Sequence, residues 1–193
     1  MSKMFDFGSG PVPAHQHPNG GGWIADTAYV AETAYVGPNA RVSDDAEVFG
    51  KAWVADDAQV YGNARVSDDA GVLGNAQVYD NAQVYGRARV SDNAQVSGNA
   101  QVSGNAEVFG EAWMFGDAGV LGNARVYDNA RVYDNAQVYG KAEVFGNAEV
   151  FGEAWVFGDA QVYGRAEVFG EAWVYDNAQV SARARVYGRA RIL

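Results

Sequence analysis

The chain has 193 residues, of which 48% are hydrophobic and 20% charged, with a formal net charge of −10. The apolar content excludes a generic disordered chain, the acidity opposes a nonspecific grip on nucleic acid, and the absence of cysteine excludes disulfides and thiolate metal sites. Because no apolar run is long enough to span a membrane and residues 1–22 lack the apolar segment of a signal peptide, we expect a cytoplasmic or virion-associated protein that binds neither membrane nor nucleic acid.

Residues 1–21 do not share the pattern of the rest and are predicted to form a separate head, either extended or folded over one end as a cap through Phe5 and Phe7. The head holds both histidines of the chain, His15 and His17. Side chains two apart on an extended segment point to one side, so this pair could contact one metal ion. Two ligands without a third fall short of a metal site, and a solvated or capping segment is the simpler interpretation. We therefore expect no metal and no cofactor.

Residues 22–193 repeat with a period of six. Alanine stands at every sixth position from Ala28 to Ala190, and valine follows two residues after each alanine, replaced only by Met114 and Ile192. The hexad therefore reads Ala, variable, Val, variable and then a corner pair such as Gly-Asn or Asp-Asn. We number these hexad positions 1 to 6.

Each hexad is predicted to form one extended side and one turn. Positions 1 and 3 point to the same side of a strand, and positions 2 and 4 point to the opposite side. Gly, Asn and Asp at the corner tolerate positive φ or bond to their own backbone, so each four-residue strand ends in a turn. A helix is excluded, because a period of six would carry the apolar residues around its axis.

Short strands that turn the same way every six residues close most simply into a triangle. One coil then has 18 residues, and residues 22–193 form about nine coils. Successive coils stack as parallel strands about 4.8 Å apart, which gives a rod ~45 Å long. The predicted fold class is all-β, a triangular parallel solenoid with alanine and valine inside a narrow prism.

Stretches such as VYGNARVSDDAGVLGNAQVYDNA, residues 60–82, resemble the hexapeptide-repeat proteins, which fold as a left-handed parallel β-helix. The resemblance covers residues 22–193, and the left-handed sense of the coil rests on it alone, because parallel crossovers are usually right-handed. Position 4 departs from the family, since it is often Tyr or Phe where the family has a small or polar residue. The segment PVPAHQHPNGGGW, residues 11–23, is also similar to uncharacterised bacterial and phage members.

Known enzymes of the superfamily that the chain resembles include acyltransferases and γ-class carbonic anhydrases, which carry histidines on their coils as a catalytic base or as zinc ligands. In this chain both histidines precede the first coil, and no loop interrupts the alanine register. No catalytic residue can therefore be carried over, and we expect a protein that is not an enzyme. Family enzymes are commonly trimers, so the resemblance implies a homo-oligomer.

Corner aspartates and outward columns of polar side chains are further candidates for function. The Asp-Asp pairs at 44–45, 56–57 and 68–69 could supply oxygen ligands to calcium, but they fall on three different corners and turn preference explains them. Residues 18 apart stack on adjacent coils, which predicts favourable cross-strand pairs. The predicted columns are a charged one, Arg89, Glu107, Arg125 and Glu143, and an amide one, Gln59, Gln77 and Gln95.

Position 4 forms three outward columns that become largely aromatic after about residue 107. Stacked rings could simply stabilise the rod, at about 0.5–1.5 kcal/mol per pair, or could mark an interface. The predicted interface column contains Phe115, Tyr133, Phe151, Phe169 and Tyr187. A second surface, predicted to bind a ligand or partner, combines the outward tryptophans of the repeated VFGEAW with neighbouring rings: Tyr139, Trp155, Phe157, Trp173 and Tyr175.

The two ends of the lattice differ in charge. Residues 181–193 hold four arginines and no acid, whereas residues 26–57 have a balance of −5. The strand edge at Leu193 is expected to be open, so head-to-tail association of copies is one prediction.

Three functions fit these observations. The first is a noncatalytic structural or interaction rod, with a phage component as one setting, that self-associates as a trimer or head to tail, or docks a protein partner. The second is a binding module for carbohydrate or another small ligand on the outward Trp, Tyr and Gln columns. The third, ranked lowest, is an atypical hexapeptide acyltransferase.

Overall fold

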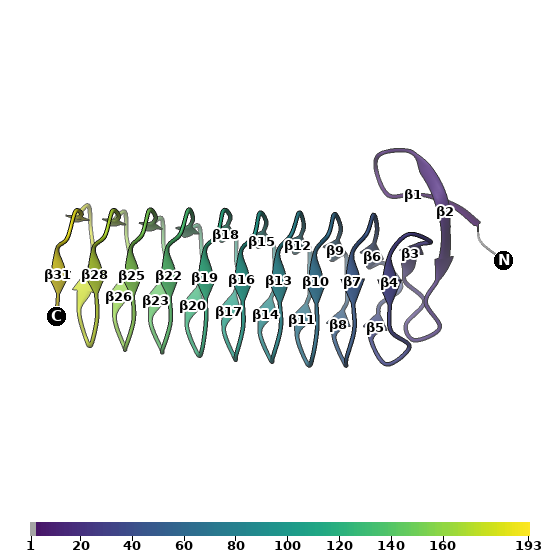
Figure 1. The fold of residues 1–193 in the computed structure, drawn as a ribbon, viewed down its shortest axis with the longest axis horizontal. Helices are drawn as coiled ribbons and strands as arrows, with labels where there is room; N and C mark the ends of the chain where they lie inside the picture. Colours follow the sequence, from purple (N-terminus) through teal and green to yellow (C-terminus); the bar gives the residue numbers. More distant parts are fainter. Residues whose placement is uncertain (1–2) are drawn as a thin grey trace.

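The computed structural model describes residues 3–193, which form β-strands and turns and no helix. Coils of three short strands build a straight rod with the head at its N-terminal end (Figure 1). Each strand pairs in parallel with the strand 18 residues further on, as in the pairs Gln59↔Gln77 and Gln77↔Gln95. The predicted all-β solenoid with about nine coils of 18 residues is confirmed, and the left-handed sense of the coil stays a prediction. Within residues 3–193 no helix is long and apolar enough to cross a membrane.

Three parallel sheets form the sides of the rod. The first contains β3 (Trp23–Ala25), β6 (Arg41–Val42), β9 (Gln59–Val60), β12 (Gln77–Val78), β15 (Gln95–Val96), β18 (Trp113–Met114), β21 (Arg131–Val132), β24 (Glu149–Val150), β27 (Glu167–Val168) and β30 (Arg185–Val186). The second contains β4 (Tyr29–Val30), β7 (Glu47–Val48), β10 (Arg65–Val66), β13 (Gln83–Val84), β16 (Gln101–Val102), β19 (Gly119–Val120), β22 (Gln137–Val138), β25 (Trp155–Val156), β28 (Trp173–Val174) and β31 (Arg191–Ile192). The third contains β5 (Tyr35–Val36), β8 (Trp53–Val54), β11 (Gly71–Val72), β14 (Arg89–Val90), β17 (Glu107–Val108), β20 (Arg125–Val126), β23 (Glu143–Val144), β26 (Gln161–Val162) and β29 (Gln179–Val180).

The strands are shorter than predicted, because each solenoid strand after β3 covers only hexad positions 2 and 3. The hydrogen bonds between coils extend further, since the Phe49 N–H at position 4 still donates to the Val66 carbonyl at 3.0 Å. The turn also begins at position 4, where the Ser43 carbonyl accepts from the Ala46 N–H at 3.3 Å. The predicted four-residue strand was therefore two residues too long, because hexad positions 1 and 4 belong to the turns.

The interior of the rod is filled by the alanines and valines of positions 1 and 3. Val102, Ala106 and Met114, for example, expose 0% of their surface. Burial of a valine side chain contributes about 1.5–3 kcal/mol before the opposing entropy is counted. Because each coil contacts only its neighbours, these contributions accumulate along the rod.

Position 5 of most corners lies in the left-handed region of the backbone, which favours glycine and, less readily, Asp or Asn. Alanine adopts it once, at Ala182 with a φ of 59°. Asp44 and Asp92, for example, have φ angles of 57° and 61°, and Gly110 has 72°. Each of these aspartates is followed one coil later by glycine, whose N–H donates to the carboxylate, as from Gly62 to Asp44 at 3.0 Å. An aspartate at the corner thus accepts a hydrogen bond from the coil stacked on it.

The head is a hairpin that extends the first sheet. Strands β1 (Lys3–Asp6) and β2 (Pro11–Gln16) pair antiparallel, and β2 continues antiparallel onto β3. Asn19 and Gly22 also bond to the backbone of Val36 in the third sheet, at 3.0 Å each. The Phe5 ring stacks on Trp23 with centroids 4.4 Å apart. The head therefore caps the N-terminal end of two of the three sheets.

Candidate interaction surface

The tryptophans at position 2 face outward, as the alternation predicts. Trp53 is 49% exposed, and Trp113 and Trp155 are each 38% exposed. Rings at position 4 are mostly half-buried, and many of them stack on the position 4 ring of the adjacent coil. The two outward positions therefore differ in their availability to a partner.

The predicted interface column forms one continuous ring stack. Adjacent centroids are 4.7 to 5.4 Å apart and the planes differ by at most 15°. The stack contains Phe115, Tyr133, Phe151, Phe169 and Tyr187. Only Tyr187, at 62%, is strongly exposed, so most of this ring surface is used within the rod.

The second predicted surface is also assembled on one side of the rod, on the second sheet and its following corner. Trp155 and Trp173 lie on paired strands with ring centroids 5.9 Å apart. Tyr139 meets Trp155 edge to face at 5.8 Å, and Phe157 meets Trp173 in the same way at 5.9 Å. Phe157 also stacks on Tyr139 at 4.9 Å and on Tyr175 at 5.3 Å. We call these five residues the tryptophan cluster.

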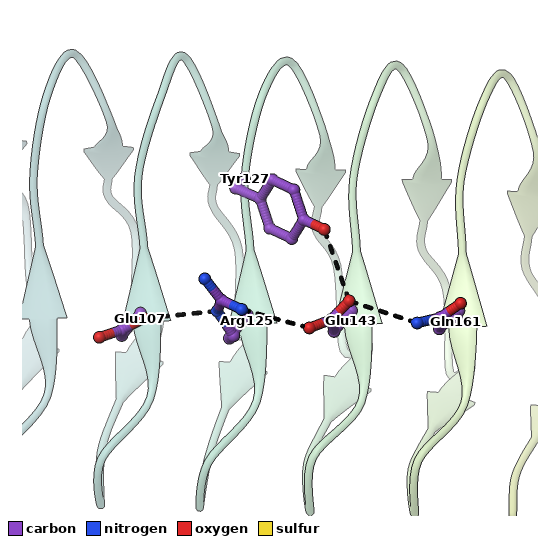
Figure 2. A network of polar contacts seen from close by, with 5 residues as sticks. All are labelled: Glu107, Arg125, Tyr127, Glu143 and Gln161. Atoms are coloured by element: carbon purple, nitrogen blue, oxygen red, sulfur yellow. Dashed lines mark hydrogen bonds and ion pairs between the residues drawn. The ribbon is translucent and has the colours of Figure 1, made fainter. Parts of the chain in front are cut away.

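Tyrosine hydroxyls at position 4 donate to the position 2 side chain of the next coil. The Tyr127 hydroxyl donates to the Glu143 carboxylate at 3.4 Å. Figure 2 shows that the same carboxylate lies in a row with Glu107, Arg125 and Gln161. Arg125 lies 3.4 Å from both Glu107 and Glu143, and Gln161 donates to Glu143 at 3.4 Å. The outward polar columns are thus largely paired within the rod.

The Tyr133 hydroxyl also donates to a position 2 carboxylate on the next coil, and its pKa is strongly raised. Burial, and secondly the Glu149 carboxylate that accepts its hydrogen bond at 3.1 Å, raise the pKa of Tyr133 from 10.0 to about 12. Because this pKa is higher in the folded state, the neutral hydroxyl stabilises the fold fully below pH 10, and this contribution is lost as the pH rises towards 12.

Tyr133→Phe is therefore expected to reduce the loss of stability between pH 10 and 12, while the ring still stacks between Phe115 and Phe151. At pH 7 the lost hydrogen bond should cost about 1 kcal/mol. Urea unfolding followed by circular dichroism at a series of pH values measures both effects. An unchanged alkaline slope in the variant would contradict this assignment.

The charged and amide columns match their prediction in register but only partly in contacts. Arg89 pairs in register with Glu107, yet within residues 3–193 no carboxylate lies within ion-pair distance of Arg89. Gln77 accepts from the Tyr61 hydroxyl at 3.2 Å. The amide ladder is found at position 6 instead, where asparagines on successive coils bond to each other, as Asn63 does to Asn81 at 3.3 Å.

The histidines and the corner aspartates do not come together in one site. The His15 Nδ1 lies 2.8 Å from the Asp26 carboxylate, whereas His17 is buried and its Nδ1 lies 3.1 Å from the Asn19 carbonyl. In the described part of the chain no group of three or more His, Cys, Asp or Glu could hold a metal ion. Asp44 has a φ of 57°, which agrees with the interpretation of the Asp-Asp pairs as turns.

One surface feature was missed from the sequence. A cavity of about 370 Å³ lies beside Trp53, where Gly71 occupies position 2 on the next coil. The signal was the segment AGVLGNA, which occurs at residues 70–76 and 118–124 and is the only place in the repeats where glycine stands at position 2. A missing side chain in an outward column should have indicated a gap.

Three segments of the rod, residues 58–74, 82–98 and 124–140, match a family model described as the YdcK beta solenoid repeat. Each segment is nearly one coil long, and the match agrees with the solenoid architecture. A comparison with curated proteins finds no match to this chain.

Proposed function

We propose that the protein is a noncatalytic interaction rod of the hexapeptide-repeat type, and that copies associate side by side through the tryptophan cluster. The observation that carries this proposal is the pair of outward indoles, Trp155 and Trp173, which interrupt a column of polar residues on the second sheet. Elsewhere in that column position 2 is mostly Glu, Arg or Gln, as in Glu47, Arg65 and Gln83.

A contiguous apolar patch on an otherwise polar surface usually marks an interface. Trp155 remains 38% exposed although it contacts two other rings, so part of the indole surface is left for a partner. Aromatic residues dominate the binding energy of most interfaces. A second copy is a suitable partner because the same patch can meet itself about a two-fold axis.

Lateral association is better supported than head-to-tail association. Pairing of strands at the N-terminal end is obstructed, because β2 covers β3 and residues 19–22 bond to β5. The arginines near the other end are also partly paired, Arg185 with Glu167 at 2.8 Å and Arg189 with Glu171 at 2.9 Å. The basic end thus has less charge to offer than the sequence indicates.

We also propose that the protein is not an enzyme and that it functions in a setting such as a phage particle. The absence of catalysis is supported by the position of both histidines in the head, where His15 pairs with Asp26 and His17 is buried. The acyltransferase alternative would need a base on the coils. An acyl-CoA turnover assay above background would remove this part of the proposal.

Replacing both Trp155 and Trp173 with serine is expected to raise the dissociation constant of the dimer or higher oligomer at least about tenfold. The fold should persist, because position 2 accepts polar side chains throughout the rod. Sedimentation velocity over a range of concentrations, with circular dichroism as the folding check, measures both outcomes. The matched control is Trp113→Ser, which removes an equally exposed indole from the first sheet. Equal association of the wild type and the double variant would contradict the proposal.

Carbohydrate binding is the second candidate, since an indole face and nearby hydrogen-bonding groups are what a sugar ring requires. On the amide and carboxylate columns the polar groups are already occupied by tyrosine hydroxyls, as at Gln77 and Glu143. The cavity beside Trp53 offers polar groups that are not occupied in this way.

A further inference from the structure

Trp53 has one covered face and one open face. Tyr35 stacks on the indole with centroids 3.9 Å apart and an interplanar angle of 18°. Parallel rings on adjacent coils lie roughly across the rod axis, so the opposite face of the indole points along the axis to the next coil. That coil carries Gly71 in register with Trp53. No side chain therefore continues the stack.

Other tryptophans of the rod have their neighbour in place. Arg131 lies over the Trp113 ring at 6.0 Å, and Arg191 lies over the Trp173 ring at 4.7 Å. Trp53 is also the most exposed of the tryptophans, at 49%. Its open face is thus a specific departure from the lattice rather than a general property of outward tryptophans.

The comparison between the two AGVLGNA segments shows that a glycine at position 2 does not by itself leave a cavity. At Gly119 an added Cβ would lie 2.3 Å from the Gln137 Oε1, so the glutamine side chain fills the gap. At Gly71 the nearest atoms to such a Cβ are the Arg89 Cγ and the Leu73 Cδ1, both 3.9 Å away. Gly71 itself is buried, with the Arg89 and Leu73 side chains at van der Waals distance from the added Cβ, and the cavity of about 370 Å³ lies beside the Trp53 ring.

The walls of this cavity are chemically distinct. Trp53 and Leu73 supply apolar surface, while Lys51, Asp69 and Arg89 supply charge. Within residues 3–193 none of these three charged side chains forms an ion pair. Two cations and one carboxylate thus surround an exposed indole face, which gives a local positive balance in a chain of net charge −10.

The spacing of the coils limits the thickness of a ligand. Trp53 and Arg89 lie two coils apart, which is about 9.6 Å at the usual separation of parallel strands. A planar ring in contact with both would need only about 7–8 Å, as two carbon–carbon contacts of ~3.5–4 Å. The Arg89 Cγ lies 3.9 Å from an added Gly71 Cβ, so a ligand would lie outward of the Gly71 backbone, with the C–H groups of a sugar ring on the indole face.

We propose that the Gly71 cavity binds a pyranose ring that carries a carboxylate, as in a uronic acid. The sugar face lies on Trp53 over the Gly71 floor, the carboxylate pairs with Arg89 and Lys51, and the Asp69 carboxylate accepts hydrogen bonds from ring hydroxyls. This site is separate from the tryptophan cluster, so it does not depend on self-association.

Titration calorimetry with methyl β-glucuronide, whose ring is locked as a pyranose, tests the proposal on the full chain. We expect saturable binding to the wild type that is weakened at least tenfold for methyl β-glucoside and for benzoate. Absence of glucuronide binding would overturn the proposal, and tighter binding of benzoate would show that the cavity takes planar aromatic anions instead.

Gly71→Gln is the decisive variant, because glutamine is common at position 2 and should fill the cavity without disturbing the core. It is expected to lose at least tenfold in glucuronide affinity while circular dichroism shows the same fold. The matched control Gly119→Gln makes the same change in the other AGVLGNA segment, where the flexible Gln137 amide can move aside, and should bind as the wild type does.

Arg89→Gln tests the role of charge and should reduce the preference for glucuronide over glucoside at least tenfold. Unchanged binding by Gly71→Gln or an unchanged preference in Arg89→Gln would overturn the proposed site. Trp155→Ser/Trp173→Ser should bind glucuronide as the wild type does, so failure of self-association and failure of sugar binding are distinguishable.

Discussion

Replacing Val102 with aspartate is expected to lower the free energy of unfolding by at least about 4 kcal/mol, enough to prevent stable folding of the central coils. The same substitution at the adjacent Gln101 should cost about 1 kcal/mol or less. The two residues are neighbours on β16, but Val102 exposes 0% of its surface and Gln101 is exposed. A carboxylate at Val102 would be desolvated among alanines and valines without a hydrogen-bond donor.

Chemical denaturation followed by far-UV circular dichroism measures this pair of variants. Because coils are stabilised only by their neighbours, the Val102 change should interrupt the rod on both sides of the altered coil. Similar destabilisation by Gln101→Asp and Val102→Asp would contradict the assignment of inward and outward positions.

Replacing Gly110 with aspartate is expected to cost about 2 kcal/mol more than the same change at Gly122. Both glycines have a left-handed backbone, with φ of 72° and 75°. At Gly110 an added Cβ would lie 2.9 Å from the Asp128 nitrogen, whereas at Gly122 the nearest atom is the Gly140 carbonyl oxygen at 3.3 Å. The new carboxylate at 110 would also stand between Asp92 and Asp128, and like charges at this spacing repel by about 1–4 kcal/mol.

The Gly122 variant reproduces the Asp-then-Gly order that occurs along the corners, since Gly140 follows it on the next coil. Its carboxylate can accept from the Gly140 N–H, as Asp92 accepts from Gly110 at 3.0 Å. Urea unfolding of both variants at low ionic strength measures the difference, which added salt should reduce. Equal costs would show that the order of aspartates in a corner column has no energetic basis.

Much of the fold could be predicted because the pattern of Ala and Val two residues apart repeats every six residues. That one pattern indicates the length of the repeat, the side of the strand to which each side chain points, and which side chains are buried. It correctly placed Val102 inside and Trp155 outside. The head could not be predicted in this way, since its attachment depends on β2 pairing antiparallel to β3 and on Asn19 bonding to Val36. The order of aspartates in the corner columns likewise depends on a contact between coils, from the Gly62 N–H to the Asp44 carboxylate.

The surface was predicted less completely than the interior. Register alone brought Trp155, Trp173 and Phe157 together, because a shift of 18 residues fixes the column. Which outward groups are already paired within the rod depends on side-chain conformations that the sequence does not specify. The Gly71 cavity is the clearest case, because an identical segment at Gly119 is filled by Gln137.

Disulfide mapping can establish whether copies of the chain meet side by side at the tryptophan cluster. The chain has no cysteine, so single substitutions Glu153→Cys and Glu111→Cys report on one location each. Both residues are exposed and precede Ala-Trp in the same EVFGEAW motif, but Trp155 lies on the second sheet and Trp113 on the first. Under mild oxidation we expect covalent dimers for Glu153→Cys and little dimer for Glu111→Cys. Equal cross-linking of the two variants, or cross-linking of Glu111→Cys alone, would contradict association through the tryptophan cluster.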